Sequence, residues 1–426
     1  MENCFFGGGT ILLPQCDLTR FATIACDQYT SEPAYWAETE AIAADVPSAL
    51  HMVLPEVYLP EGEESVSARI ECIGQTMRNY LEEGLFAEYP DACVLVERRL
   101  RDGRTRYGLL GLIDLEQYDY HAEAGSYIRA TEETVLSRIP ARVRIRQGAP
   151  LEMPHLMLLA DDREHELIEV IAAGRENLTK LYDFDLMHES GHLTGYLLDE
   201  AAMELVRGCM AKWSDPDYFR RKYRSTAHPL VLAVGDGNHS LAAAKECYEQ
   251  VKAAIGPERA AIHPARYALA ELVNIHDPAL DFEPIYRLIR GAELDDLLNY
   301  LRAKEPAFHG GMSRQGEISL YFQSELERRT LSIPAEAGLL PVQILQPLLD
   351  AYLAEHPEVS IDYIHGLETV RSLGREPGCI AISFNGIAKE QLFGAIVHGG
   401  VLPRKTFSMG HAEDKRFYLE CRKVVE

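Results

Sequence analysis

The stretch PLVLAVGDGNHSLAAAKECYEQVKAAIGP, residues 229–257, is the strongest local signal in the chain. Its apolar run at 230–234 has the length of a buried strand. Beyond the next turn, apolar or small residues recur at helical spacing, at Leu241, Ala244, Cys247, Tyr248, Val251, Ala254 and Ile255. Gly256 and Pro257 are typical of a helix end. The stretch therefore predicts a strand, a tight turn at residues 235–240 and a long helix.

Outward from this stretch, short β-like runs and amphipathic helical runs alternate along the chain. Asp102-Gly103 lies between apolar runs at 92–100 and 105–115, which is a strong signal of a β-hairpin. We expect the arginines around this turn to be solvated, namely Arg98, Arg99, Arg101, Arg104 and Arg106. The whole pattern predicts an α/β or α+β fold with mixed sheets and flanking helices.

Two features predict where a helix begins and where a domain ends. A helix is expected in SEPAYWAETEAIAAD, with Ser31 as its N-cap and Pro33 in its first turn. A domain boundary is expected where Gly310-Gly311 follows a charged helix. This predicts a main α/β region at 1–305, which carries the ligand site. A C-terminal α/β region at 306–426 is expected to pack onto or complete the same site.

The net charge limits the partners of this chain. Its 426 residues include 66 Asp plus Glu and 42 Lys plus Arg, so the formal net charge is −24. A field of that sign repels nucleic acid and anionic lipid. A site for a small phosphorylated or anionic ligand must therefore be built locally, from arginines or backbone amides.

Cysteine usage and hydropathy indicate a cytoplasmic protein. The nine cysteines contain no Cys-x-x-Cys pair, which is typical of reduced thiols. The first residues lack the basic region of a signal peptide, and no uncharged run approaches the ~18 residues that cross a bilayer. We expect no membrane partner. The sequence is compatible with a homo-oligomer and with a monomer.

The turn GDGNHS suits an anion. The first amides of a helix have no acceptor within the helix, and the helix dipole is positive there. Gly235 and Gly237 would let the backbone approach a phosphate or carboxylate. The alternative is an ordinary tight turn in which Asn238 or Ser240 caps the helix and Asp236 bonds its own backbone.

A basic segment, YIRATEETVLSRIPARVRIRQ at 127–147, stands out in an acidic chain. It contains Arg129, Arg138, Arg142, Arg144 and Arg146. In an extended segment, the last three would share one face and suit multivalent phosphate recognition. The alternative is a solvated edge strand whose charges deter aggregation.

Three further motifs contain residue types that occur in active sites. His188-Glu189-Ser190-Gly191-His192 matches H-E-x-x-H, but a zinc protease needs that motif inside a helix and the flank HLTGYLL favours a strand. We therefore expect no stoichiometric zinc. Glu32 in CDQYTSEP is a secondary candidate base. Near the C-terminus, Lys405, Thr406 and Ser408 follow Pro403 in an expected loop or edge.

Five motifs together resemble a known bacterial family. They are GDGNHSLAAAK (235–245), IRATEETVLSRIPARVRIR (128–146), FEPIYRLI (282–289), IDYIHG (361–366) and LPRKTF (402–407). Over most of its length the chain resembles the family called domain of unknown function 1015. The family pattern is matched by Asp236, Gly237, His239, Glu132, Thr134, Arg142, Arg287 and Lys405. Typical members carry His and Arg where this chain has Asn238 and Ser240.

A more distant resemblance suggests a use for the turn. An Asp-Gly-His-x-Arg motif followed by a helix is similar to the phosphate-binding motif of the ParB/sulfiredoxin-like superfamily. In that group, which includes nucleotide-using enzymes, a strand-turn-helix holds nucleotide phosphates. The resemblance implies that residues 235–240 bind phosphate here, with Arg142 or Arg287 in place of the arginine lost at Ser240.

The leading prediction is a nucleotide- or phosphometabolite-binding protein that acts as a small-molecule phosphotransferase. Asp236 or Glu132 would hold Mg²⁺ or act as base, and His239 would contact phosphate. The ligand would be held by Gly235, Gly237, Asn238, Ser240, Thr134, Arg142, Arg287 and Lys405. The implied cofactor is ATP, ADP or another nucleotide with Mg²⁺. The alternatives are a non-catalytic nucleotide sensor and a metal-dependent hydrolase that uses His188, Glu189 and His192.

Overall fold

The computed structural model describes residues 5–121, 125–134, 139–311, 314–334 and 339–425. Arg138, part of the predicted basic segment, lies outside these ranges. The chain divides into two compact units, Met1–Leu280 with His411–Glu426, and Asp281–Gly410. This division differs from the expected boundary near residue 305. The reason is that strand β15 (Phe282–Arg290) pairs with strands from later in the second unit.

The first unit contains a large mixed sheet. Its strands follow the order β11-β12-β5-β6-β14-β10-β13-β8-β7, and β1 also pairs with β6. In that order they are Thr179–Asp185, His192–Leu197, Val94–Arg99, Thr105–Asp114, Tyr267–Asn274, Met157–Ala160, Leu232–Asp236, Ile128–Ala130 and Tyr118–Asp119, with β1 at Phe6–Gly7. The pairs β10–β14, β8–β13 and β7–β8 are parallel and the others are antiparallel. The mixed sheet confirms the predicted fold class.

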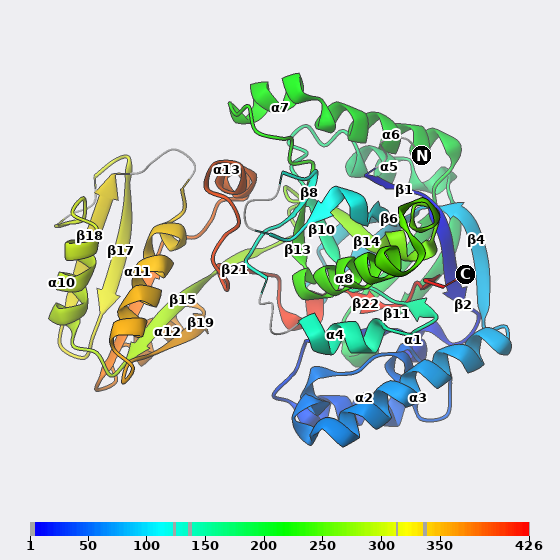
Figure 1. Cartoon of the computed structure of the whole chain (residues 1–426), viewed down its shortest axis with the longest axis horizontal. Coiled ribbons are helices and arrows are strands. Elements are labelled where there is room, and N and C mark those ends of the chain that lie inside the picture. Colours follow the sequence, from blue (N-terminus) through cyan, green and yellow to red (C-terminus); the bar gives the residue numbers. More distant parts are fainter. Residues whose placement is uncertain (1–4, 122–124, 135–138, 312–313, 335–338, 426) are drawn as a thin grey trace. The chain divides into compact units, whose positions relative to one another are not determined.

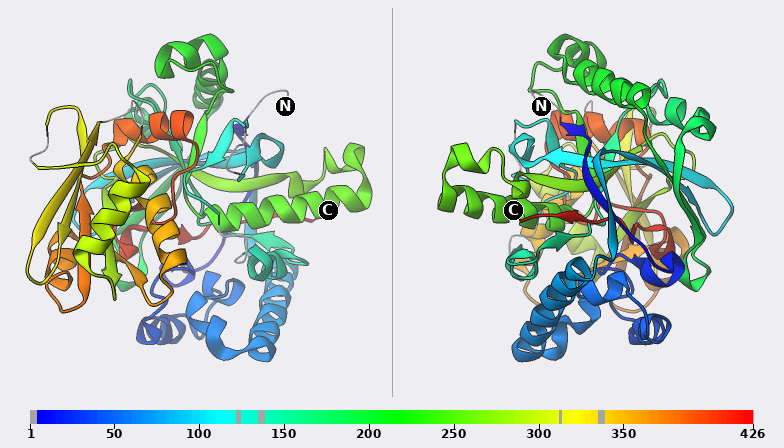
Figure 2. Two further views of the ribbon diagram at one scale, coloured as in Figure 1. Left: turned by 60° about the vertical axis from the view of Figure 1, so that its left-hand side comes forward. Right: turned by 90° about the vertical axis from the view of Figure 1, so that its right-hand side faces the viewer.

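Helices pack around this sheet at two ends of the unit. α2 (Pro33–Ala43) and α3 (Glu63–Glu82), in blue, lie on one side (Figures 1 and 2). α5 (Ile168–Ala173), α6 (Glu200–Ser214) and α7 (Pro216–Tyr223), in green, lie on the other. The remaining helices described in this unit are α1 (Leu18–Phe21), α4 (Ile139–Arg146), α8 (Asn238–Ile255) and α9 (Pro257–Ala260). Two buried apolar cores form in this way, one with Trp36 and one with Trp213.

The C-terminal segment returns to the first unit and closes two small sheets. β22 (Phe417–Tyr418) pairs with β3 (Thr23–Ile24), and β23 (Arg422–Lys423) pairs with β9 (Leu151–Glu152). A third small sheet pairs β2 (Gly9–Pro14) with β4 (Phe86–Ala92). The return places residues more than 390 positions apart side by side, as in the hydrogen bond from the Cys26 amide to the Tyr418 hydroxyl.

Several local predictions are confirmed and two are wrong. The hairpin is confirmed, because β5 and β6 pair antiparallel across Asp102-Gly103. Arg98 and Arg106 are not solvated, however; they are 2% and 3% exposed. The helix with Pro33 in its first turn is confirmed, but Glu32 rather than Ser31 holds the N-cap position.

The second unit contains an antiparallel sheet. Its order is β16-β18-β17-β20-β15-β19, and β21 also pairs with β15. In that order the strands are His309–Gly310, Arg328–Pro334, Glu317–Gln323, Cys379–Phe384, Phe282–Arg290 and Ser360–His365, with β21 at Phe407–Met409. The helices are α10 (Leu294–Lys304), α11 (Pro341–Glu355), α12 (Leu367–Leu373) and α13 (Lys389–Gly399). Across the described residues of both units, none of the helices combines the length and the apolarity that a membrane span requires.

Candidate functional site

The predicted strand-turn-helix is present in the first unit. β13 ends at Asp236, Gly237 adopts the left-handed region with φ 81° and ψ 23°, and α8 begins at Asn238. A Cβ on Gly237 would lie 2.7 Å from Leu156 Cδ2 and 3.3 Å from Leu156 Cα. Both the backbone conformation and the neighbouring chain therefore require glycine at this position.

The beginning of α8 is not capped by a side chain in the described part of the chain. Gly237 occupies the N-cap position, so neither Asn238 nor Ser240 is the cap. The Asp236 carboxylate does accept a hydrogen bond from the Gly237 amide at 2.9 Å. The first turn of α8 lies in the positive field of the helix dipole, which stabilises an anion at this position.

The sheet brings a second predicted segment to this turn. β8 runs parallel to β13, and the Thr131 hydroxyl donates to the Val234 carbonyl at 2.7 Å. Parallel strands end at the same edge, so Glu132 and Thr134 follow β8 next to the turn that follows β13. The Thr134 hydroxyl oxygen is buried and has no hydrogen-bond partner among the described residues.

Residues 139–146 of the basic segment form the helix α4 and not an extended strand. α4 packs on α8 because Ile139 and Val143, four residues apart, meet Ala242 and Ala243. On a helix, residues two apart point about 200° apart, so the expected row of three guanidiniums does not form. Each arginine has a carboxylate partner instead, in the pairs Arg142–Glu56, Arg144–Glu63 and Arg146–Glu152.

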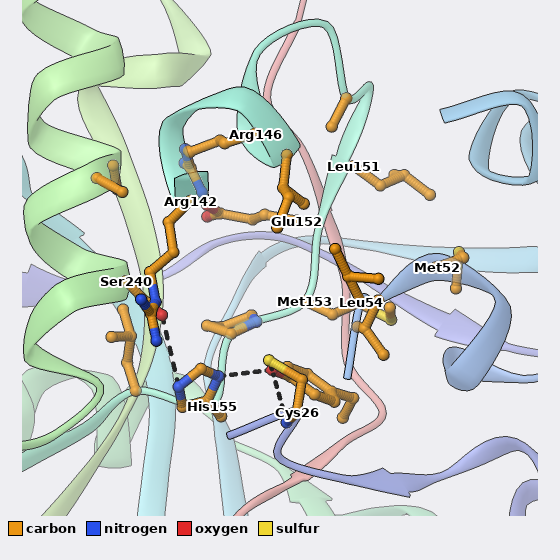
Figure 3. Close-up of a pocket in the computed structure, with 18 of the residues that line it drawn as sticks. Cys26, Met52, Leu54, Arg142, Arg146, Leu151, Glu152, Met153, His155 and Ser240 are labelled. Carbon is orange, nitrogen blue, oxygen red and sulfur yellow. Dashed lines mark hydrogen bonds and ion pairs between the residues drawn. The ribbon is translucent and has the colours of Figure 1, made fainter. Parts of the chain in front are cut away.

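A group of polar side chains that the sequence did not single out lies beside α8. His155 precedes β10, which pairs with β13, and its Nε2 lies 3.5 Å from Ser240 Oγ and 3.6 Å from Asp27 Oδ2. Its Nδ1 lies 2.6 Å from the Tyr418 hydroxyl, which lies 3.1 Å from Cys26 Sγ. Figure 3 shows His155 between Ser240 and Cys26.

Asp27 is the ionised member of this group. Burial raises the pKa of its carboxyl, but the charge of His155, the hydrogen bond from Gln28 and the charges of Lys415 and Arg142 together bring the pKa below its usual value. The carboxylate is therefore charged at neutral pH and can accept a proton or a cation.

Cys26 and Tyr418 are in their neutral forms. Burial, followed by the charge of Asp27, raises the pKa of the Cys26 thiol to about 12. Burial also raises the pKa of the Tyr418 phenol well above its usual value. Cys26 is thus a protonated thiol and not an activated nucleophile.

Lys415 links the turn to this group. Its Nζ lies 3.1 Å from Asp236 Oδ2, and its charge also lowers the pKa of Asp27. The backbone next to Lys415 is held by the two buried arginines of the hairpin. Arg98 donates to the Glu413 carbonyl at 2.9 Å, and Arg106 donates to the Asp414 carbonyl at 3.1 Å.

A pocket of about 150 Å³ lies next to these side chains. Its polar lining includes His155, Ser240 and Arg142, and its apolar lining comes from the 3₁₀ helix η1 (Ala49–Met52) and the residues after it, from α3, α4 and α8, and from the segment before β10. All of its lining residues belong to the first unit. The pocket, the beginning of α8, and the side chains of Asp27, His155, Asp236 and Lys415 form the candidate site.

The remaining predicted site residues belong to both units. Arg287 and Lys405 belong to the second unit, where the fully buried Arg287 guanidinium donates to Gln346 Oε1 at 2.8 Å and to the Lys405 carbonyl at 2.8 Å. In the first unit, Gly235, Asn238 and His239 are half-buried in the turn and the start of α8. Glu32 is exposed at the start of α2.

The H-E-x-x-H match is not in an α-helix. Met187–Glu189 forms a 3₁₀ turn in which His188 has φ 56°, and His192 begins β12, as the strand prediction required. His188 Nε2 bonds the Thr39 hydroxyl at 2.9 Å, and His192 lies between Asp183 and Asp185. The described residues contain no cluster of three or more His, Cys, Asp or Glu side chains placed to hold a metal.

Comparison with known proteins identifies the family. The family model described as "Protein of unknown function (DUF1015)" matches residues 11–352, and the chain belongs to this family. A search of curated proteins finds no match to the chain.

Solved structures show distant likenesses. A free serine kinase mutant in complex with ADP is 11% identical with a TM-score of 0.39, covering 74% of this chain and 91% of that chain. A conserved hypothetical protein from Pyrococcus furiosus is 11% identical with a TM-score of 0.36, over 74% and 94% of the two chains. SbnI with a C-terminal truncation, from Staphylococcus aureus, is 10% identical with a TM-score of 0.36, over 71% and 82%. Because the sequence identities and the TM-scores are both low, these likenesses carry no argument about function, and the proposed function rests on the residues of this chain.

Proposed function

We propose that the first unit binds a phosphorylated small molecule at the beginning of α8 and transfers a phosphoryl group. One observation carries this proposal. The ionised Asp27 carboxylate lies 3.6 Å from His155, which lies 3.5 Å from Ser240 in the first turn of α8, and the Lys415 ammonium lies 3.1 Å from Asp236, at the end of β13 just before that helix. His155 and Ser240 also line the pocket. Phosphoryl transfer needs an anion site, a neutralising cation and a proton acceptor, and these groups supply all three.

The roles follow from the chemistry of each group. The first-turn amides of α8 and the Lys415 ammonium hold the phosphoryl oxygens and offset the charge that develops on them. Asp27 accepts the proton of the acceptor hydroxyl. The hydroxyl oxygen then bonds to phosphorus, while the bond from phosphorus to the leaving oxygen breaks. His155, between Asp27 and Ser240, is a positioning residue for Asp27.

A nucleotide such as ATP or ADP with Mg²⁺ remains our candidate donor. Mg²⁺ is commonly bound by one or two carboxylates together with substrate phosphates. Asp27 and Asp236 are the aspartates that we assign to the site, and Asp236 is already paired with Lys415. When bound, Mg²⁺ would neutralise phosphate charge next to Asp27.

The test is a screen followed by a turnover assay. Thermal-shift measurements with nucleotides and phosphorylated metabolites, with and without Mg²⁺, identify the ligand. ³¹P NMR of the protein with the best nucleotide and a panel of small alcohols then detects a new phosphate ester. Asp27→Asn should bind the ligand and lose turnover, whereas the exposed Asp45→Asn should keep both.

Two results would change the assignment. Binding without any turnover would favour a non-catalytic sensor. Loss of turnover in Glu32→Gln but not in Asp27→Asn would move the role of proton acceptor to Glu32. If no phosphorylated compound stabilises the protein, the proposal fails.

A further inference from the structure

The pocket beside α8 has a polar side and an apolar side. Ser240 and His155 lie on one side, and Met52, Leu54, Leu151 and Met153 gather on the other (Figure 3). The apolar side chains are buried, at 1%, 4%, 2% and 8% exposed in that order. A ligand that extends from the beginning of α8 into the pocket therefore meets hydrocarbon and thioether groups.

The charged residues that line the pocket are already paired. Arg142 pairs with Glu56, and Arg146 pairs with Glu152. Glu152 also accepts from Arg422 at 3.0 Å and from the Leu269 amide at 2.9 Å. Burial raises the pKa of Glu152, but Arg146, Arg422 and this amide bring it below its usual value, so the pair stays ionised. An additional charge on the ligand would have no counterion on this side.

The size of the pocket limits the group that fits. Its volume is about 150 Å³. An engineered cavity of about that volume in another protein, lined by Leu, Ile and Phe, binds benzene. Thioether sulfurs such as those of Met52 and Met153 also make favourable contacts with aromatic rings.

We propose that this pocket binds an uncharged group of the size of one six-membered aromatic ring, carried by the acceptor substrate. The proposal rests on the function proposed above, because the phosphate end of the product then lies at the beginning of α8. The acceptor is thus an aryl-substituted alcohol such as a benzyl alcohol. Its O–H loses the proton to Asp27, its oxygen bonds to phosphorus, and the donor's oxygen leaves.

The test uses two phosphate esters that differ only in the ring. Binding of benzyl phosphate and of methyl phosphate to the full chain is measured by isothermal titration calorimetry. Benzyl phosphate should bind at least tenfold more tightly. Equal affinities would overturn the ring pocket and leave the anion site standing. Binding of benzyl alcohol but of neither phosphate ester would support the ring pocket and remove the proposed phosphate function.

A variant of a pocket residue tests whether the ring of benzyl phosphate binds in this pocket. Ala149 lines the pocket and is 6% exposed, so Ala149→Leu would occupy part of the volume. It should reduce the benzyl phosphate affinity to that of methyl phosphate and leave the methyl phosphate affinity unchanged. The exposed Ala201→Leu is the matched control. An Ala149→Leu protein that is folded and keeps the preference for benzyl phosphate would place the ring elsewhere and overturn the proposal. If Ala149→Leu does not fold, the comparison of the two esters on the unmodified chain still decides.

Discussion

Lys415 and Arg416 are neighbours in the chain, yet their side chains reach two different clusters. Lys415 pairs with Asp236 at the candidate site, where the two side chains are 12% and 21% exposed. Arg416 pairs with Glu271 and Glu420 in a cluster in which the three residues are 5%, 2% and 2% exposed. Each cation has a carboxylate partner, but only the first pair lies where solvent or a ligand can replace an interaction.

The comparison separates a charge that holds the fold from a charge that can bind. Arg416 also donates to the Pro154 carbonyl at 3.2 Å, next to His155, so the closed cluster supports the open one. A buried ion pair has little freedom to exchange partners, because either ion alone would be desolvated without a counterion. A partly exposed pair such as Lys415–Asp236 can exchange its partner for a phosphate at modest cost.

The largest effect is expected from Arg416→Met. It leaves Glu271 and Glu420 buried without their shared cation, and the free energy of unfolding of the first unit should fall by about 3–5 kcal/mol. Both tryptophans of the chain, Trp36 and Trp213, lie in this unit, so their fluorescence during urea unfolding reports on it alone. Lys415→Met is the matched control, and an equal loss in both variants would refute the comparison.

Gly237→Ala should have the next largest effect. Ala in the left-handed region is strained, and its Cβ would crowd Leu156, so the free energy of unfolding should fall by about 1–3 kcal/mol. Gly256→Ala is the control, because Gly256 has φ 85° and no atom within 4 Å of the added Cβ. It should show the backbone part of the loss alone. If both variants are equally destabilised, the approach of Leu156 does not matter.

Lys415→Met should change stability little and ligand binding strongly. A partly exposed ion pair contributes up to about 1 kcal/mol, so the urea midpoint should move slightly. The stabilisation that a phosphorylated ligand gives in a thermal-shift assay should be lost, since the cation at the beginning of α8 is gone. Unchanged stabilisation by the ligand would exclude Lys415 from the anion site.

The sequence predicted the parts of the site that are local. The strand, the turn and α8 follow from apolar spacing within residues 229–257, and all three are present. The alternation of Arg142 and Arg144 with apolar residues suggested a strand, but the contacts of Ile139 and Val143 with α8 favour a helix. That choice depends on tertiary packing, which local spacing does not contain.

The sequence did not reveal the residues that distant segments bring to α8. Asp27 and Tyr418 meet because β3 pairs with β22, and His155 reaches α8 because β10 pairs with β13. Arg98 is buried because the Glu413 carbonyl, 315 residues away, accepts from it. A local signal lies in the polar stretch CDQYTSEP, which contains both Asp27 and the predicted secondary base Glu32.

The smallest effect concerns the pH dependence that Asp27 contributes. Its pKa in the folded protein lies below its usual value, through the charges of His155, Lys415 and Arg142 and the hydrogen bond from Gln28, which together outweigh burial. An Asp with a lowered pKa stabilises the fold fully above its unfolded pKa of about 3.9, and this contribution disappears as the pH falls through the folded pKa. The unmodified protein should therefore be more stable than Asp27→Asn at pH 6–7, and the difference should shrink below about pH 4. Urea unfolding monitored by tryptophan fluorescence, from pH 7 to pH 3, measures this difference in the free energy of unfolding. The exposed Asp45→Asn is the control, and it should show no such change with pH. A difference that stays constant or grows as the pH falls would mean that Asp27 is not held in its ionised form, and the proton acceptor at the site would have to be another residue.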